Sequence, residues 1–151
     1  MNASEFTFRR VSADDEMRAA LRVRHMVFCD EQHVPEDLEY DEFDESAVHY
    51  LIVHDKRGVI GTARLLEYHP AGTCKVGRFA ILPEFRGMGL GAGLMRFIED
   101  EARSQGYRLI VLDAQLQVRV FYEGLGYVAE GGIFLDAGIE HIRMTKVLSD
   151  E

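Results

Sequence analysis

One stretch decides the fold: Leu82-Pro83-Glu84-Phe85-Arg86-Gly87-Met88-Gly89-Leu90-Gly91-Ala92-Gly93. It follows an apolar, strand-like run and opens a helix-like run from Leu94 to Ser104. Four glycines in seven residues remove Cβ atoms where a ligand can approach the backbone. A loop that feeds a helix start presents free N–H groups, and the helix dipole favours negative charge there. With Arg86 at its mouth, the stretch predicts a cradle for a phosphate group.

Two familiar phosphate loops fit this stretch poorly. A P-loop kinase needs Gly-Lys-Ser/Thr at the end of the loop, whereas here Leu94 follows Gly93. A nucleotide-binding oxidoreductase is harder to dismiss, because a Gly-x-Gly-x-x-Ala pattern is present and Asp113 follows about 20 residues on. Against it, five residues with a proline separate the strand from the glycines, and the loop lies in mid-chain. The dinucleotide interpretation therefore stays open as an alternative.

The third interpretation is a family resemblance. Arg86, Gly89, Gly91 and Ala92 spell Arg-x-x-Gly-x-Gly-Ala, which resembles the pyrophosphate-binding loop of the GNAT (GCN5-related) N-acetyltransferases, where it grips coenzyme A. Further along the chain, the run 121–127, Phe-Tyr-Glu-Gly-Leu-Gly-Tyr, resembles the Phe-Tyr-x-x-Leu-Gly-Phe/Tyr block of the same family.

Looser motifs point to one branch of that family. The run 24–35 carries Arg-x-x-Val-Phe-x-x-Glu-Gln-x-x-Pro, which resembles the ElaA/YjcF-like GNAT branch. The acidic run 41–44 and the segment Gly138 to Met144 resemble the same branch. The resemblance extends from about Phe8 to Val147.

Composition narrows the remaining possibilities. At 151 residues the chain is expected to form one domain, 1–151, with a substantial core. Two cysteines make no disulfide framework and have no zinc-ligand spacing, so we expect reduced thiols, a cytoplasmic location and no metal. No apolar run has transmembrane length, and the N-terminus shows no secretory signal, so no membrane partner is expected.

Charge is unevenly distributed. A net charge of −9 argues against nucleic acid as a partner, because phosphate binding needs a basic footprint. Much of the acid lies between Asp30 and Glu45, which we call the acidic segment. It is either a solvated face or a negative rim that attracts a cationic amine, and the two interpretations are compatible.

Residue periodicity predicts alternating elements. Strands are expected over 6–11, 48–55, 59–68, 73–81, 107–113, 127–130 and 141–148, and helices over 13–28, 94–104 and 116–124. The glycine pair at 131–132 and the run 136–138, Asp-Ala-Gly, are expected to form turns. Hairpins in the first half and helical crossovers in the second predict an α/β (α+β) domain, a mixed central sheet flanked by helices. This order matches the single-domain GNAT fold.

The resemblance implies acetyl-CoA (coenzyme A) as cofactor. In that family, a bulged strand before the loop contacts the acetyl carbonyl through its backbone, which corresponds here to Phe79, Ala80 and Ile81. The pyrophosphate contacts correspond to Arg86, Gly87, Met88, Gly89, Leu90, Gly91 and Ala92. Gln115 stands where the family often has asparagine, and it can hydrogen-bond the cofactor.

Three residues are candidates for catalysis. Tyr122 matches the family tyrosine that protonates or hydrogen-bonds the coenzyme A sulfur, and a phenol of pKa about 10 suits that task. Its alternative is an ordinary core aromatic. Glu31 is a candidate to receive or orient the amine, or else a surface acid. His141 is a candidate base that titrates near neutral pH, or else a structural histidine.

Arginines are candidates for substrate binding. Arg24 either pairs with the acidic segment, the interpretation placed first, or anchors a substrate carboxylate or phosphate. Arg78 is a second candidate, and Arg64 a weaker one.

Together these features predict an acetyl-CoA-dependent N-acetyltransferase that acts on a small-molecule primary amine by direct attack in a ternary complex. The alternative is a non-catalytic acyl-CoA-binding or regulatory module. The resemblance also allows a homodimer.

Overall fold

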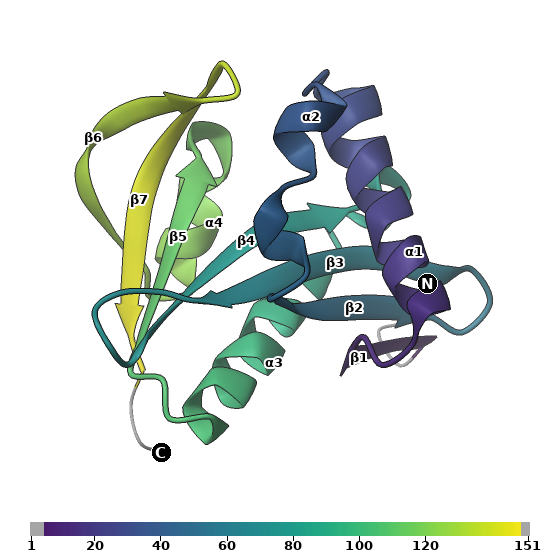
Figure 1. The fold of residues 1–151 in the computed structure, drawn as a ribbon, viewed down its shortest axis with the longest axis horizontal. Helices are drawn as coiled ribbons and strands as arrows, with labels where there is room; N and C mark the ends of the chain where they lie inside the picture. The colour runs from purple at the N-terminus through teal and green to yellow at the C-terminus, as the bar shows by residue number, and fades with distance from the viewer. Residues whose placement is uncertain (1–4, 149–151) are drawn as a thin grey trace. The chain divides into compact units, whose positions relative to one another are not determined.

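The computed structural model describes residues 5–148 and contains a seven-stranded sheet of order β1-β2-β3-β4-β5-β7-β6 (Figure 1). The strands are β1 Phe6–Arg10, β2 Val48–His54, β3 Gly58–Glu67, β4 Thr73–Ile81, β5 Leu109–Gln115, β6 Val128–Asp136 and β7 Ile139–Val147. The α-helices are α1 Asp14–Arg24, α2 Glu36–Glu39, α3 Leu90–Ser104 and α4 Arg119–Gly124. Strands β4 and β5 pair in parallel, whereas β1–β2, β2–β3, β5–β7 and β6–β7 are antiparallel. The predicted mixed α/β class is therefore confirmed.

The backbone divides into two compact units, which are described separately. Unit 1 contains the described chain up to Leu66 together with Arg78–Ile98. Unit 2 contains Glu67–Gly77 and the described chain from Glu99 onward.

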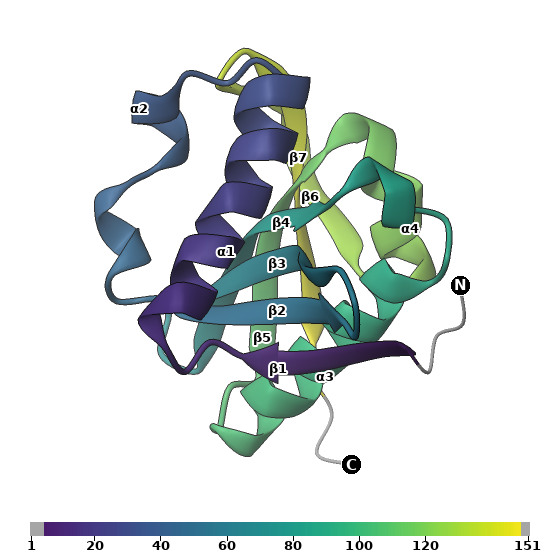
Figure 2. The same cartoon turned by 90° about the vertical axis from the view of Figure 1, so that its right-hand side faces the viewer.

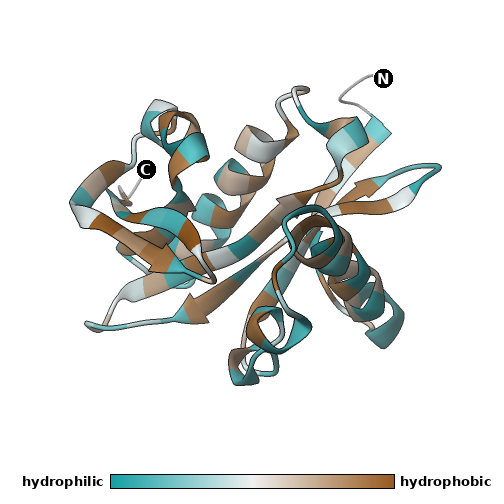
Figure 3. Ribbon diagram, turned by 90° about the horizontal axis from the view of Figure 1, so that it is seen from above, coloured by the Kyte–Doolittle hydropathy of each residue, from teal (hydrophilic) through white to brown (hydrophobic). Residues whose placement is uncertain are grey.

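Unit 1 is built on the antiparallel strands β1, β2 and β3. Helix α1 crosses β2 and β3 on one face of these strands in both views (Figure 1, Figure 2). The middle of α3 contacts β1 and β2 through aromatic rings: the Phe97 ring lies 6.4 Å from that of Phe8 and 6.0 Å from that of Tyr50. The β2–β3 hairpin is largely apolar along its strands and hydrophilic at its turn, residues 55–57 (Figure 3). The apolar strands of the hairpin therefore form the core of unit 1 together with the helices that pack on them.

Two helix predictions for unit 1 need correction. The helix expected over 13–28 ends as an α-helix at Arg24 and continues as a π-helix, η2, from His25 to Glu31. The helix expected from Leu94 begins at Leu90, because the N–H of Gly93 already donates a helical hydrogen bond to the carbonyl of Gly89 at 3.1 Å. Glycines have low helix propensity, so the sequence pattern indicated a helix only from the residue after the last glycine of the loop.

Unit 2 contains β5 at its centre. The first part of β4 pairs with it from Thr73–Leu109 to Val76–Leu112, and β7 pairs with its other edge. Strand β6 is longer than the predicted 127–130, because the glycine pair at 131–132 lies in an irregular part of the strand, between Glu130 and Phe134, and forms no chain reversal. The reversal comes at Ala137 and Gly138, with φ of +50° and +76°.

Among residues 5–148, no helix has the length and apolar character needed to cross a bilayer.

Candidate active site

The loop after β4 is anchored to unit 1 at its base. The N–H of Leu82 donates to the carbonyl of Ile60 on β3 at 2.9 Å. Phe85 is fully buried, with the Phe6 and His54 rings 5.9 and 5.7 Å from its own. The loop therefore leaves the sheet from a fixed point, with Arg86 directly after the buried phenylalanine.

The glycines of the loop have different tasks. Gly87 and Gly89 have φ of +78° and +81°, the left-handed region that glycine adopts readily. A Cβ atom at either position would meet no heavy atom of the described chain within 4 Å, so the backbone there is open. At Gly93, in contrast, a Cβ would lie 2.5 Å from Cζ of Phe8. Thus Gly87 and Gly89 shape an open loop, whereas Gly93 permits close packing on β1.

The start of α3 provides hydrogen-bond donors beside this loop. Its first helical bond runs from Gly93 to Gly89, so the N–H groups of Leu90, Gly91 and Ala92 have no partner within the helix. Donors at a helix N-terminus, together with the helix dipole, suit an anion such as a phosphate group.

Arg86 and Glu31 form an ion pair in unit 1. Nη1 and Nη2 of Arg86 each donate to one Glu31 oxygen at 2.8 Å, and Nε donates to the carbonyl of Ile81 at 2.9 Å. This hydrogen bond and the positive charge lower the pKa of the Glu31 carboxyl. A carboxylate with a lowered pKa is a weaker base, and the expected role of Glu31 in receiving or orienting the amine stays a prediction.

Strand β4 is irregular just before the loop. Arg78 has φ +51°, an uncommon backbone conformation for a residue with a side chain. The next residues, Phe79, Ala80 and Ile81, end the strand. A Cβ at Gly61 of β3 would lie 3.3 Å from the Ala80 carbonyl oxygen, so the glycine allows β3 and β4 to approach closely. The strand in which a bulge is expected thus has an irregular backbone at Arg78, and the bulge itself stays a prediction.

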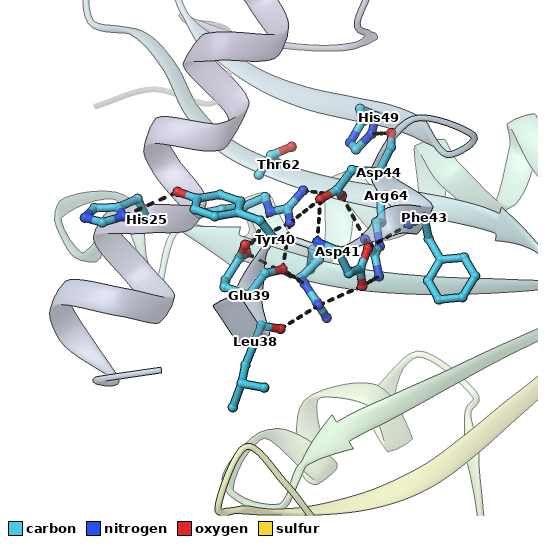
Figure 4. A network of polar contacts seen from close by, with 12 residues as sticks. His25, Leu38, Glu39, Tyr40, Asp41, Phe43, Asp44, His49, Thr62 and Arg64 are labelled. Atoms are coloured by element: carbon cyan, nitrogen blue, oxygen red, sulfur yellow. Dashed lines mark hydrogen bonds and ion pairs between the residues drawn. The ribbon is translucent and has the colours of Figure 1, made fainter. Parts of the chain in front are cut away.

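A network of charged side chains holds the acidic segment against unit 1 (Figure 4). Arg24 donates from Nε and Nη2 to the Glu39 carboxylate at 2.7 and 2.9 Å, and from Nη1 to Asp44 at 2.8 Å. Arg64 of β3 donates to Asp41 at 2.6 and 2.8 Å and to Asp44 at 2.8 Å. Three carboxylates from the segment that contains α2 thus converge on arginines from α1 and β3.

Arg78 completes this network from β4. Its Nε donates to the backbone carbonyl of Glu39 at 3.0 Å, and its Nη2 donates to Asp41 at 3.1 Å. Its guanidinium therefore binds the acidic segment. The substrate-binding role expected for Arg78 stays a prediction beside this role in holding the segment.

The network settles the two interpretations of Arg24. Its side chain is 1% exposed and that of Glu39 is 2% exposed, so neither can reach a substrate in this arrangement. The pairing with the acidic segment is confirmed, and the substrate anchor is withdrawn. Sequence shows that an arginine and acids are present but not that the arginine faces inward, so the anchor stayed open until the structure was known.

Burial and charge act in opposite directions on these groups. Burial alone would raise the pKa of Asp44, but hydrogen bonds and positive charge from Arg24 and Arg64 outweigh it and lower the pKa. The imidazole of His49 donates from Nε2 to the Asp44 carbonyl at 2.8 Å, and burial lowers the pKa of His49. The network thus favours ionised carboxylates beside a neutral histidine.

In unit 2, the two tyrosines of the 121–127 motif differ. Tyr122 on α4 is 7% exposed, and burial raises the pKa of its phenol, which stays protonated at neutral pH. Tyr127 donates from its hydroxyl to Glu99 at 2.8 Å, and Lys146 donates to the other oxygen of Glu99 at 3.0 Å. Tyr127 is therefore engaged in holding the motif in place, and Glu99 and Lys146 are structural residues that no sequence motif revealed.

The other candidates of unit 2 lie next to each other. Gln115 at the end of β5 is the cross-strand partner of His141 on β7. The Nδ1 of His141 lies 2.7 Å from the Ile139 carbonyl, which can only accept, so Nδ1 carries a proton. In the neutral form of the ring, Nε2 is then the nitrogen that can accept a hydrogen bond.

Sequence comparisons identify relatives along almost the whole chain. A family model described as "Acetyltransferase (GNAT) domain" matches residues 10–148. The Bacillus subtilis "Uncharacterized protein YyaT" is 35% identical over 145 residues, which cover 93% of this chain and 95% of that protein. The "Uncharacterized N-acetyltransferase YjcF" of the same organism is 34% identical over 134 residues, 88% of this chain and 94% of that protein.

A solved structure shares the fold. The crystal structure of Escherichia coli ElaA aligns with a TM-score of 0.80 and 21% identity, covering 93% of this chain and 99% of that chain.

Proposed function

Because this chain belongs to the GNAT acetyltransferase family, in its ElaA/YjcF-like branch, we propose that it acetylates a small primary amine by direct attack in a ternary complex. Members of the family take the acetyl group from acetyl-CoA, whose thioester supplies an activated acyl group. One observation carries the proposal: after β4, whose backbone is irregular at Arg78, an open glycine backbone leads past Arg86 into the N-terminus of α3.

The loop fits a pyrophosphate in three respects. Gly87 and Gly89 leave open backbone where a Cβ would otherwise stand, the first turn of α3 offers N–H donors, and Arg86 adds a positive charge. We propose that Arg86, Gly87, Met88, Gly89, Leu90, Gly91 and Ala92 hold this group, mainly through the main chain. Phe79, Ala80 and Ile81 are the proposed backbone contacts for the acetyl end, and Gln115 is a further proposed cofactor contact.

Two side chains of unit 2 remain as proposed proton carriers. Tyr122 Oη carries the proton that a departing thiolate needs, and the raised pKa of this phenol keeps that proton in place until then. His141 Nε2 is the proposed site that accepts a proton from the amine, directly or through water. The assignment of Tyr122 rests on its match to the family motif.

The amine acceptor is supported by charge. Glu39, Asp41 and Asp44 are compensated by arginines, but the acidic segment also contains Asp30, Glu36, Asp37, Glu42 and Glu45, and the whole chain carries −9. This excess favours a cationic acceptor. The free thiols of Cys29 and Cys74 fit the cytoplasmic location that we propose. The homodimer stays a prediction.

Calorimetric titration with acetyl-CoA, coenzyme A and NADH tests the cofactor. We expect binding of the two coenzyme A species, none of NADH, and weaker coenzyme A binding in Arg86→Gln. The matched control is Arg57→Gln, which removes one positive charge from the exposed ion pair of Arg57 with Glu84. Failure of wild-type protein to bind acetyl-CoA contradicts the proposal, and binding of NADH favours the oxidoreductase.

Thiol release with a panel of small amines then tests transfer. Release that depends on both acetyl-CoA and an amine supports the enzyme. Cofactor binding without thiol release for any amine favours the non-catalytic binding module.

A further inference from the structure

Glu31 binds the guanidinium of Arg86, which is the cation that the loop offers to an anionic ligand. Both terminal nitrogens of Arg86 bind the carboxylate, and its third nitrogen binds the Ile81 carbonyl. Both side chains are partly exposed, at 42% and 39%. A guanidinium has five N–H groups, and contacts with residues 5–148 use three of those of Arg86, which leaves two for a ligand.

A pyrophosphate can approach this guanidinium in two ways. It can bind the guanidinium edge that Glu31 now occupies, because carboxylates and phosphates both accept two hydrogen bonds from such an edge. In that case the ion pair of Arg86 with Glu31 must break. It can instead use the two remaining N–H groups, and then the Glu31 charge stays close to the phosphate charges and repels them. Glu31 therefore opposes the bound anion in either arrangement.

Glu31 is held in this position by the fold. It is the last residue of the π-helix η2, which follows directly after Arg24 and its buried partners. The chain then turns, with the N–H of Gln32 donating to the Val27 carbonyl at 3.2 Å. The carboxylate is thus carried by an anchored segment. A π-helix is rare and often marks a functional position.

We propose that Glu31 is an internal competitor for the pyrophosphate of the cofactor and that it limits the affinity of unit 1 for coenzyme A. The inference rests on the proposed function of the loop. Glu31 is then a specificity-determining residue. Its removal raises the affinity for ligands that carry the pyrophosphate and does not raise the affinity for a short thioester without phosphate.

Coenzyme A titrations of Glu31→Gln and Glu31→Ala test the proposal. Both variants should bind coenzyme A about two- to fivefold more tightly than wild type, the range expected when an exposed ion pair is lost. The gain should shrink as KCl rises, because salt screens exposed charges. S-acetylpantetheine, which lacks the pyrophosphate, should show no corresponding fall in KM with either variant when it is used as acetyl donor in the thiol-release assay.

Glu84→Gln is the matched control. Glu84 lies two residues before Arg86, and it makes the same two-pronged contact with Arg57 at 3.0 and 3.0 Å. Its loss removes the same charge at a position within the loop without touching Arg86, so coenzyme A affinity should change less than in Glu31→Gln. Thermal melting of each variant verifies that the fold is retained.

Several results would overturn the inference. Unchanged or weaker coenzyme A binding in both Glu31 variants means that Glu31 orients Arg86 or has no influence. An equal gain in Glu84→Gln means that general charge, not competition for Arg86, is responsible. If wild-type protein binds no coenzyme A, the proposed function of the loop is wrong. The wild-type titration alone shows this, so it is distinguished from a failure of the inference about Glu31.

Discussion

The Nε of Arg24 donates a 2.7 Å hydrogen bond to Glu39 Oε1 at a place where both side chains are almost fully buried. The arginine ends α1 and the glutamate ends α2, so one contact joins two segments separated by 15 positions in sequence. Asp44 and Arg64 extend the contact to β3. This pair is the centre of the network that fixes the acidic segment.

Loss of Arg24 should be costly for stability. Removing one partner of a buried ion pair leaves an uncompensated charge, so Arg24→Met should lower the free energy of unfolding by about 3–5 kcal/mol. Urea denaturation measures the change. Arg119→Met is the control, because the pair of Arg119 with Glu123 is exposed and its loss should cost about 0.5 kcal/mol or less. Similar small losses in both variants would contradict the prediction.

His49 should make stability depend on pH. Burial lowers the pKa of its imidazole in the folded state, with Arg24 and Arg64 acting in the same direction and Asp44 opposing them. The unfolded state, with a pKa of about 6.5, then binds more protons. Stability is thus full above about pH 6.5 and falls as the pH drops toward the lower folded value. Denaturation curves of His49→Gln should show a smaller fall, and parallel pH profiles for the two proteins would refute this role.

The loop glycines should affect cofactor binding more than stability. Alanine at Gly89 would have to adopt φ near +81°, which costs about 1–2 kcal/mol. Gly106→Ala carries a comparable strain, at φ +91°, and also meets no described atom within 4 Å. Both variants should lose similar stability in thermal melts, but only Gly89→Ala should lose coenzyme A affinity. Equal affinities would remove Gly89 from the proposed cradle.

Gly93 is predicted to matter for packing. Its alanine variant places a Cβ 2.5 Å from the Phe8 ring, an overpacking that should cost about 1–3 kcal/mol. Phe8→Leu removes the ring atoms that cause the clash. In a double-mutant cycle measured by denaturation, the two changes together should therefore cost less than their sum. Strict additivity would show that the ring does not limit residue 93.

Removal of the hydroxyl should affect catalysis at Tyr122 and stability at Tyr127. Tyr122→Phe should lower the rate of thiol release by about 100-fold or more without changing cofactor affinity, because it removes the proposed proton carrier. Tyr127→Phe should lower the free energy of unfolding by about 1.5–3 kcal/mol, because it removes the hydrogen bond to the charged Glu99. If Tyr122→Phe leaves the rate unchanged, the tyrosine is only a core aromatic.

Local motifs carried much of the fold prediction. The glycines and Arg86 indicated the loop, and the alternation of apolar residues located all seven strands, with errors mainly at β6. Boundaries were wrong where glycines weakened the periodic signal, at the start of α3 and within β6. In both cases backbone hydrogen bonds, which sequence patterns do not reveal, continued the element.

The sequence by itself determined the fold class, the family and the position of the candidate phosphate loop, because these depend on backbone conformations that short motifs encode. Only the tertiary structure decided which charges pair. It placed Arg24 and Arg78 in the network with the acidic segment and brought Glu31, 55 positions away in sequence, onto Arg86. Ion pairs depend on which side chains meet in space, and residue types along a chain do not specify that.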